Sequence, residues 1–137
     1  MPRVVRWYLR TALLMFVLAL AVGLLVTLGA VLPSLPPGLT PVYFHLLMVG
    51  WVTQFILGVA LWLLPKYSQQ QPRRSDTVSW MVYGLLNAGL LARAAAEPLN
   101  SLHPGTGWGW LLVISALLQW LAGLFFVVNT WQRVKGK

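Results

Sequence analysis

Four long apolar stretches make up most of the chain, and they constrain its fold more than any other feature. They cover residues 11–32, 41–64, 78–98 and 108–130. A hydrocarbon core about 30 Å thick is crossed by a helix of about 20 apolar residues. A backbone in lipid must bond its own N–H and C=O groups, which favours helices. We therefore expect an all-α polytopic membrane protein in which residues 1–137 form one domain, an up-down bundle of four transmembrane helices.

The basic residues predict how these helices are oriented. Nine of the ten Lys and Arg side chains lie before the first stretch, between the second and third, or after the fourth: Arg3, Arg6, Arg10, Lys66, Arg73, Arg74, Arg133, Lys135 and Lys137. With four spans these regions share one side, which the positive-inside rule assigns to the cytoplasm. We expect a bacterial-type inner membrane, both termini in the cytoplasm, and a first helix that is retained as an anchor because it exceeds the length of a signal-peptide core.

Several classes of function are disfavoured by composition. Without cysteine the chain has no disulfide and no thiolate metal site. The basic residues form short clusters at the ends of apolar segments rather than a groove-filling element, so no nucleic-acid partner is expected. The two acidic residues, Asp76 and Glu97, are predicted on opposite sides of the membrane, and no Ser–His–acid arrangement is recognisable. We expect no catalysis by this chain alone.

Local signals place helix ends and contacts. Ser75 or Asp76 is expected to cap the third helix, and that helix is expected to close at Glu97-Pro98. Small residues and two glutamines recur at every fourth position, a pattern typical of close helix packing. They form the stripes Ala19–Gly23–Thr27, Gly50–Gln54–Gly58, Gly84–Ala88–Ala92 and Ser115–Gln119–Gly123. Gln54 and Gln119 are interpreted as packing residues that could face each other, with a substrate-lining role as the alternative.

Ionisable residues inside a span are candidates for function. His45, Arg93 and Glu97 are predicted at similar depth near the outer surface, with His103 in the following outer loop. Arg93 and Glu97, four residues apart, either form an ion pair that makes the arginine tolerable or leave Arg93 to meet an anion such as a cofactor carboxylate.

His45 has two interpretations. It is either an interfacial histidine bonded to a carbonyl or to water, or a ligand of haem iron whose other ring nitrogen is held by an acceptor. On a regular α-helix it shares a face with apolar side chains that suit either a porphyrin edge or another helix. These are Met48, Val49, Val52, Ile56 and Val59.

The arrangement of His45, Gly50, Gly58 and Pro65 along one span resembles the second helix of the catalytic subunit of haem-copper oxidases, most closely the nitric oxide reductase branch. The resemblance covers roughly the first three helices and implies that His45 is an axial ligand of a low-spin haem b. A full catalytic subunit of that family has many more helices and several more metal-binding histidines. The second axial ligand is then either His103, a weak candidate, or His45 of a second copy in a symmetric dimer.

Two functions follow as hypotheses. The first is a haem-b protein of a respiratory system, related to oxidase or nitric oxide reductase, that transfers electrons or senses a gas. The second is a cofactor-free accessory or assembly subunit of a larger respiratory complex. A solute transporter ranks last, because the pattern shows no clearly broken helix and no charge in the middle of a span.

Overall fold

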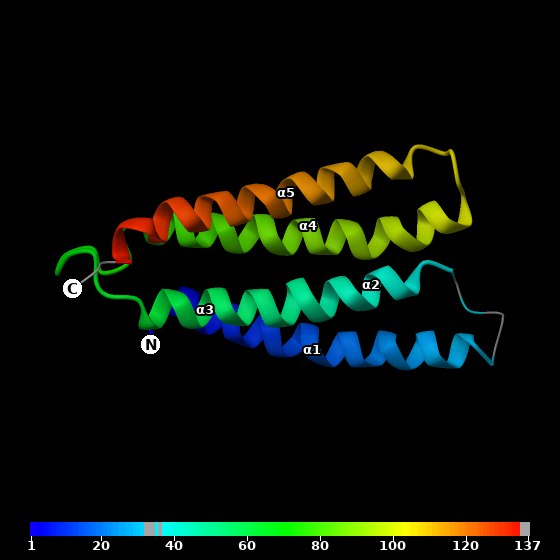
Figure 1. The fold of residues 1–137 in the computed structure, drawn as a ribbon, viewed down its shortest axis with the longest axis horizontal. Coiled ribbons are helices and arrows are strands. Elements are labelled where there is room, and N and C mark those ends of the chain that lie inside the picture. The colour runs from blue at the N-terminus through cyan, green and yellow to red at the C-terminus, as the bar shows by residue number, and fades with distance from the viewer. Residues whose placement is uncertain (32–34, 36, 135–137) are drawn as a thin grey trace.

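The computed structural model describes residues 1–31, 35 and 37–134, and within them the chain is all-helical. Two antiparallel helical hairpins lie side by side, with the N-terminus and the last described residues at the same end (Figure 1). We call this the terminal end, and the opposite one the far end. In chain order the elements are α1 (Arg3–Gly29), α2 (Leu39–His45), the π-helix η1 (Leu46–Thr53), α3 (Gln54–Leu63), α4 (Asp76–Leu102), α5 (Trp108–Thr130) and the short 3₁₀ helix η2 (Trp131–Arg133).

The elements α2, η1 and α3 form one continuous helix, Leu39–Leu63, which we call the composite helix. It packs on α1 to make the first hairpin, while α4 and α5 make the second. The prediction of four helices in up-down order is therefore confirmed. The helix predicted at 108–130 has the bounds of α5, and the composite helix differs from its prediction by two residues at the start and one at the end.

Two predicted helix ends are wrong by more than two residues, and in both cases the predicted helix is too short. Helix α1 begins at Arg3 rather than at residue 11, because arginine is a good helix former and charge at a span's end does not stop a helix. The predicted end of that helix, residue 32, lies outside the described residues. Helix α4 passes Pro98 and ends at Leu102, although a proline lacks the N–H donor and crowds the carbonyl one turn earlier. Ser75 caps α4 as predicted, accepting a hydrogen bond from the Val78 N–H at 3.2 Å.

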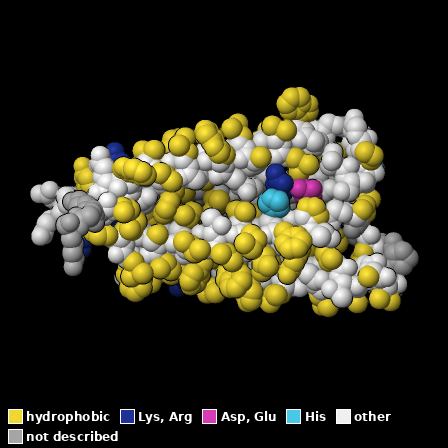
Figure 2. Space-filling model, viewed as in Figure 1, with side chains coloured by type: hydrophobic (Ala, Val, Ile, Leu, Met, Phe, Trp, Pro, Cys, Tyr) yellow, Lys and Arg dark blue, Asp and Glu magenta, His cyan; other side chains and the backbone are white. Residues whose placement is uncertain are grey.

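The chain carries helices that are long and apolar enough to cross a membrane. Three qualify by length and composition, Arg3–Gly29, Leu39–Leu63 and Trp108–Arg133. Large hydrophobic side chains cover much of the outer surface of the hairpins (Figure 2). Helix α4 has 27 residues but also carries Asp76, Arg93 and Glu97, and it is not among the three.

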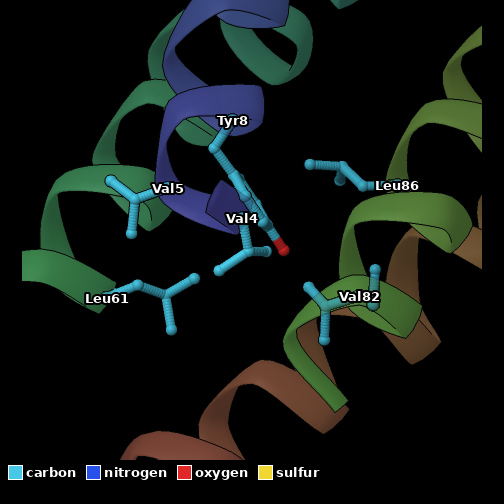
Figure 3. Close-up of a cluster of buried hydrophobic side chains, with 7 residues drawn as sticks. Val4, Val5, Tyr8, Leu61, Val82 and Leu86 are labelled. Carbon is cyan, nitrogen blue, oxygen red and sulfur yellow. The ribbon is translucent and has the colours of Figure 1, made fainter. Parts of the chain in front are cut away.

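The core differs between the two ends of the molecule. Toward the terminal end, one cluster joins both hairpins, with Tyr8 at its centre (Figure 3). Its buried members are Val4, Val5, Tyr8, Leu61, Val82, Leu86 and Ala122. The Tyr8 hydroxyl donates to the Ser79 carbonyl at 2.9 Å. The second cluster, toward the far end, contains Met15, Ala19, Val42, Leu46 and Leu90, and no residue of α5. Helix α5 therefore shares the core of the first hairpin only near the terminal end.

Candidate functional site

His45 is the last residue of α2 and is half-buried. Its Nδ1 lies 2.9 Å from the carbonyl oxygen of Pro41, one helical turn earlier. A carbonyl oxygen only accepts, so in this hydrogen bond Nδ1 carries the proton. In the neutral ring Nε2 then keeps its lone pair, which is the state in which an imidazole binds a metal.

The π-helix η1 begins directly after His45. π-helical turns are rare and occur frequently at functional sites. Here the wider turn keeps a four-residue stripe on one face, since Val42, Leu46, Gly50, Gln54 and Gly58 are all buried. In a regular α-helix at about 100° per residue, the last of these would have turned by about 160° from the first.

The π-helix changes the predicted face around His45. Beyond Thr53 the composite helix is no longer in register with a regular α-helix that starts at His45. Ile56, predicted on the His45 face, is 58% exposed, whereas Gly58 is buried. Of the other apolar side chains expected on this face, Met48 is also exposed, whereas Val49, Val52 and Val59 are half-buried. The π-helix contains no proline, and no pattern in the sequence predicted it.

Arg93 on α4 is the centre of a polar network that joins α4 to α5. Its Nη1 donates to Glu97 Oε1 at 3.1 Å, and its Nε lies 3.4 Å from Ser115 Oγ on α5. Ser115 is fully buried and donates to the Gly89 carbonyl at 2.6 Å, while Gln119 Nε2 donates to Ser115 Oγ at 3.1 Å. The side chains of Arg93 and Glu97 are 18% and 16% exposed. Arg93 and Glu97 therefore form the ion pair that was one of the two interpretations. Ser115 also contacts Arg93, and the spacing of residues along the sequence could not predict this contact between two helices.

His45 is level with Arg93 across the interface between the hairpins. Gly38, directly before the composite helix, lies against Glu97 and Ser101, and Gly50 within the helix lies against Leu90. His45 falls between these two contacts. Figure 2 shows a histidine, a basic and an acidic side chain together between the hairpins, in the half toward the far end. The similar depth predicted for His45 and Arg93 is therefore found.

His103 lies apart from this group. It follows the last residue of α4 and is exposed. It is ten residues beyond Arg93, about 15 Å along the helix axis at 1.5 Å per residue. Among the described residues, no group of three or more His, Asp or Glu side chains could hold a metal ion. One chain therefore offers a single histidine at the depth of Arg93.

The two glutamines both take part in packing, but with different partners. Gln54 is fully buried, and its Nε2 lies 3.5 Å from the Tyr8 carbonyl on α1. Gln119 is bonded to Ser115 on its own helix. The expectation that Gln54 and Gln119 could face each other is not met by these hydrogen bonds. The stripe around Gln54 is buried against α1, because a Cβ added at Gly58 would lie 2.8 Å from Tyr8 Cβ.

Arg133 is a structural residue that sequence reasoning missed. It is 1% exposed, and its guanidinium donates to the carbonyl oxygens of Leu61, Leu64 and Pro65 at 3.1, 2.8 and 3.0 Å. These carbonyls lie at the C-terminal end of α3, where the helix dipole favours a cation. The position of Arg133 after the last span served only to predict the orientation of the helices. No sequence pattern indicated that its side chain is buried.

No protein-family model, curated protein or solved structure matches this chain.

Proposed function

We propose that this chain is a four-span membrane protein that binds haem b through His45, with the second axial ligand supplied by His45 of a second copy. The observation that carries the proposal is the hydrogen bond from His45 Nδ1 to the Pro41 carbonyl, which leaves Nε2 as the basic nitrogen. With both axial positions held by imidazoles, bound haem would supply reversible one-electron exchange, and a diatomic gas would bind only by displacing one of them.

Arg93 supports the same assignment by its depth and charge. A guanidinium matches a carboxylate in fork geometry, and haem carries two propionates. Because Glu97 already accepts from Arg93 Nη1, it holds the guanidinium in position at the level of His45. Arg93 would then orient the cofactor's acidic edge, and Glu97 would act through Arg93.

The arrangement of charge supports four spans with the terminal end in the cytoplasm of a bacterial-type cell. The described basic residues at this end lie in the first turns of α1, between the hairpins or after α5. The remaining arginine, Arg93, is paired with Glu97 inside α4. A paired arginine near the end of α4 is compatible with a span, since the pair reduces the cost of burying either charge. We further propose that the chain serves a respiratory membrane system, as the resemblance of its second span to haem-copper oxidases implies.

A reduced-minus-oxidised visible spectrum of the protein, purified in mild detergent after expression with haem available, tests the proposal. We expect a low-spin b-type signal with one haem per two chains. His45→Ala should abolish it, and His103→Ala is the matched control that should retain it. A His45→Ala protein with the full signal would overturn the proposal, as would a colourless wild type.

The second candidate function is a cofactor-free accessory or assembly subunit. It is favoured by two outward glycines, Gly84 on α4 and Gly123 on α5, each with no atom within 4 Å of an added Cβ. Outward small residues let a neighbouring helix approach closely. This alternative predicts a colourless protein that co-purifies from native membranes with a larger complex, and Gly84→Leu should reduce that co-purification.

A further inference from the structure

Three arginines form a stripe along the start of α1. Arg3, Arg6 and Arg10 are separated by three and four residues, a spacing that places side chains on one face of a helix. All three are exposed, and Trp7 on the same face is 54% exposed. We call Arg3, Arg6, Trp7 and Arg10 the arginine stripe.

The arginine stripe lines a surface pocket that continues onto apolar surface. The pocket has a volume of about 230 Å³ and is lined by Arg3, Arg6, Trp7 and Arg10. A second pocket of about 170 Å³ shares Trp7 and Arg10 with it and adds Thr11 and Leu14. The polar pocket lies nearer the terminal end of α1, and the apolar one lies deeper along the span. Trp7 is held edge-on by Trp80 and Tyr83, with ring centroids 6.5 Å away in both cases.

The charge of the arginine stripe is not balanced by either acidic side chain of the protein. The chain has two acidic side chains, and each is already paired, Asp76 with Arg73 and Glu97 with Arg93.

Other arginines at the terminal end have acceptors within the chain. Arg74 donates to the Val128 carbonyl, and Arg133 donates to three carbonyls. Within the described part of the chain, the side chains of Arg3, Arg6 and Arg10 form no hydrogen bond or ion pair.

We propose that the arginine stripe binds one phospholipid with a negatively charged headgroup. The guanidinium groups of Arg3, Arg6 and Arg10 would hold the phosphate by paired N–H···O bonds. Trp7 would lie at the headgroup level, where tryptophan is enriched in membrane proteins. One acyl chain would follow the apolar pocket past Leu14. A free phosphate would fill only the polar pocket, so the apolar continuation favours a lipid. This inference is independent of haem binding.

Native mass spectrometry of the delipidated full-length protein in detergent tests the inference, with phosphatidylglycerol and phosphatidylcholine of identical acyl chains as probes. We expect selective binding of one phosphatidylglycerol. The triple variant Arg3→Gln, Arg6→Gln, Arg10→Gln should lower that affinity on the order of 100-fold, about fivefold per arginine. Each single variant should then lose about fivefold, which provides the same test if the triple variant does not fold.

Matched controls separate a site from general charge attraction. The variant Lys66→Gln, Lys135→Gln, Lys137→Gln removes the same charge and should keep its phosphatidylglycerol affinity within about threefold of wild type. Equal losses in the two triple variants would overturn the inference. Glycerol phosphate and inorganic phosphate should displace the lipid poorly. Displacement by either at the concentration at which the lipid binds would mean that only an anion site is present.

Discussion

The guanidinium Nη2 of Arg133 donates a hydrogen bond of 2.8 Å to the carbonyl oxygen of Leu64, although 69 residues separate them in the chain. Bonds to Leu61 and Pro65 complete the contact, so the end of the second hairpin is joined to the end of α3. Together with the cluster around Tyr8, this contact closes the terminal end of the bundle.

Replacing Arg133 should destabilise the contact between the end of the second hairpin and the end of α3. Hydrogen bonds to charged groups contribute about 1.5–3 kcal/mol each, and three acceptors would be left without this donor. We expect Arg133→Met to reduce stability by about 2 kcal/mol or more, and Arg133→Lys to lose less, since lysine keeps the charge without the planar fork. Thermal unfolding in detergent measures the difference. A melting temperature equal to wild type in Arg133→Met would contradict the expected contribution.

Gly50 and Gly84 provide a matched pair for testing helix packing. A Cβ added at Gly50 would lie 2.8 Å from Leu90 Cδ2 and 2.9 Å from Met15 Cβ, whereas at Gly84 it would meet open space. Overpacking costs about 1–3 kcal/mol, so Gly50→Ala should lower the melting temperature. Gly84→Ala should leave it unchanged or raise it, because alanine favours helix by about 1 kcal/mol. Equal effects of the two substitutions would show that the close approach at Gly50 is not limiting.

Ser115 should be a sensitive point of the contact between α4 and α5. Ser115→Ala removes the donor to the Gly89 carbonyl and the acceptor for Arg93 Nε and Gln119 Nε2. Leaving such buried groups without partners costs about 1–3 kcal/mol each. We expect a lower melting temperature and faster amide hydrogen exchange in α5 near residue 115. The exposed Ser101 on α4 supplies the control, and Ser101→Ala should change neither measurement.

The pair formed by Arg73 and Asp76 predicts a small pH dependence. Arg73 donates to both carboxylate oxygens, at 2.6 and 2.8 Å, and this lowers the pKa of Asp76 below its usual value. Because the folded-state pKa lies below the unfolded one, near about 3.9, the contribution is fully present above that pH. It is lost as the pH falls through the folded-state pKa. The Asp76 side chain is 57% exposed, so the effect is at most about 1 kcal/mol.

Melting temperatures of wild type and Asp76→Asn between pH 7 and pH 3 check this dependence. The wild type should be slightly more stable at neutral pH, and the difference should shrink toward pH 3. A difference that grows on acidification would contradict the direction of the pKa shift.

Apolar length and composition were sufficient to predict the four helices, and the bounds of α5 were reproduced because Gly107 and the end of the apolar run mark them. Helix geometry also placed His45 and Arg93 at one depth, since a fixed rise per residue converts chain position into height. It did not identify Ser115 as the partner of Arg93 or Leu64 as the partner of Arg133. Those contacts depend on how one helix is rotated against another, which periodicity within a single helix does not specify.

The composite helix carries a change of phase at η1. Compared with a regular α-helix, α3 is rotated about the helix axis relative to α2, so that Val42 and Gly58 are buried on the same side of the composite helix. Deleting one residue within Leu46–Thr53, and thereby restoring regular α-helical winding, would rotate α2 against α3 by about 100°. His45 would then leave the interface that contains Arg93 while Gln54 stayed against α1. The π-helix therefore allows His45 to face the interface with Arg93 while Gln54, about two turns later, packs against α1.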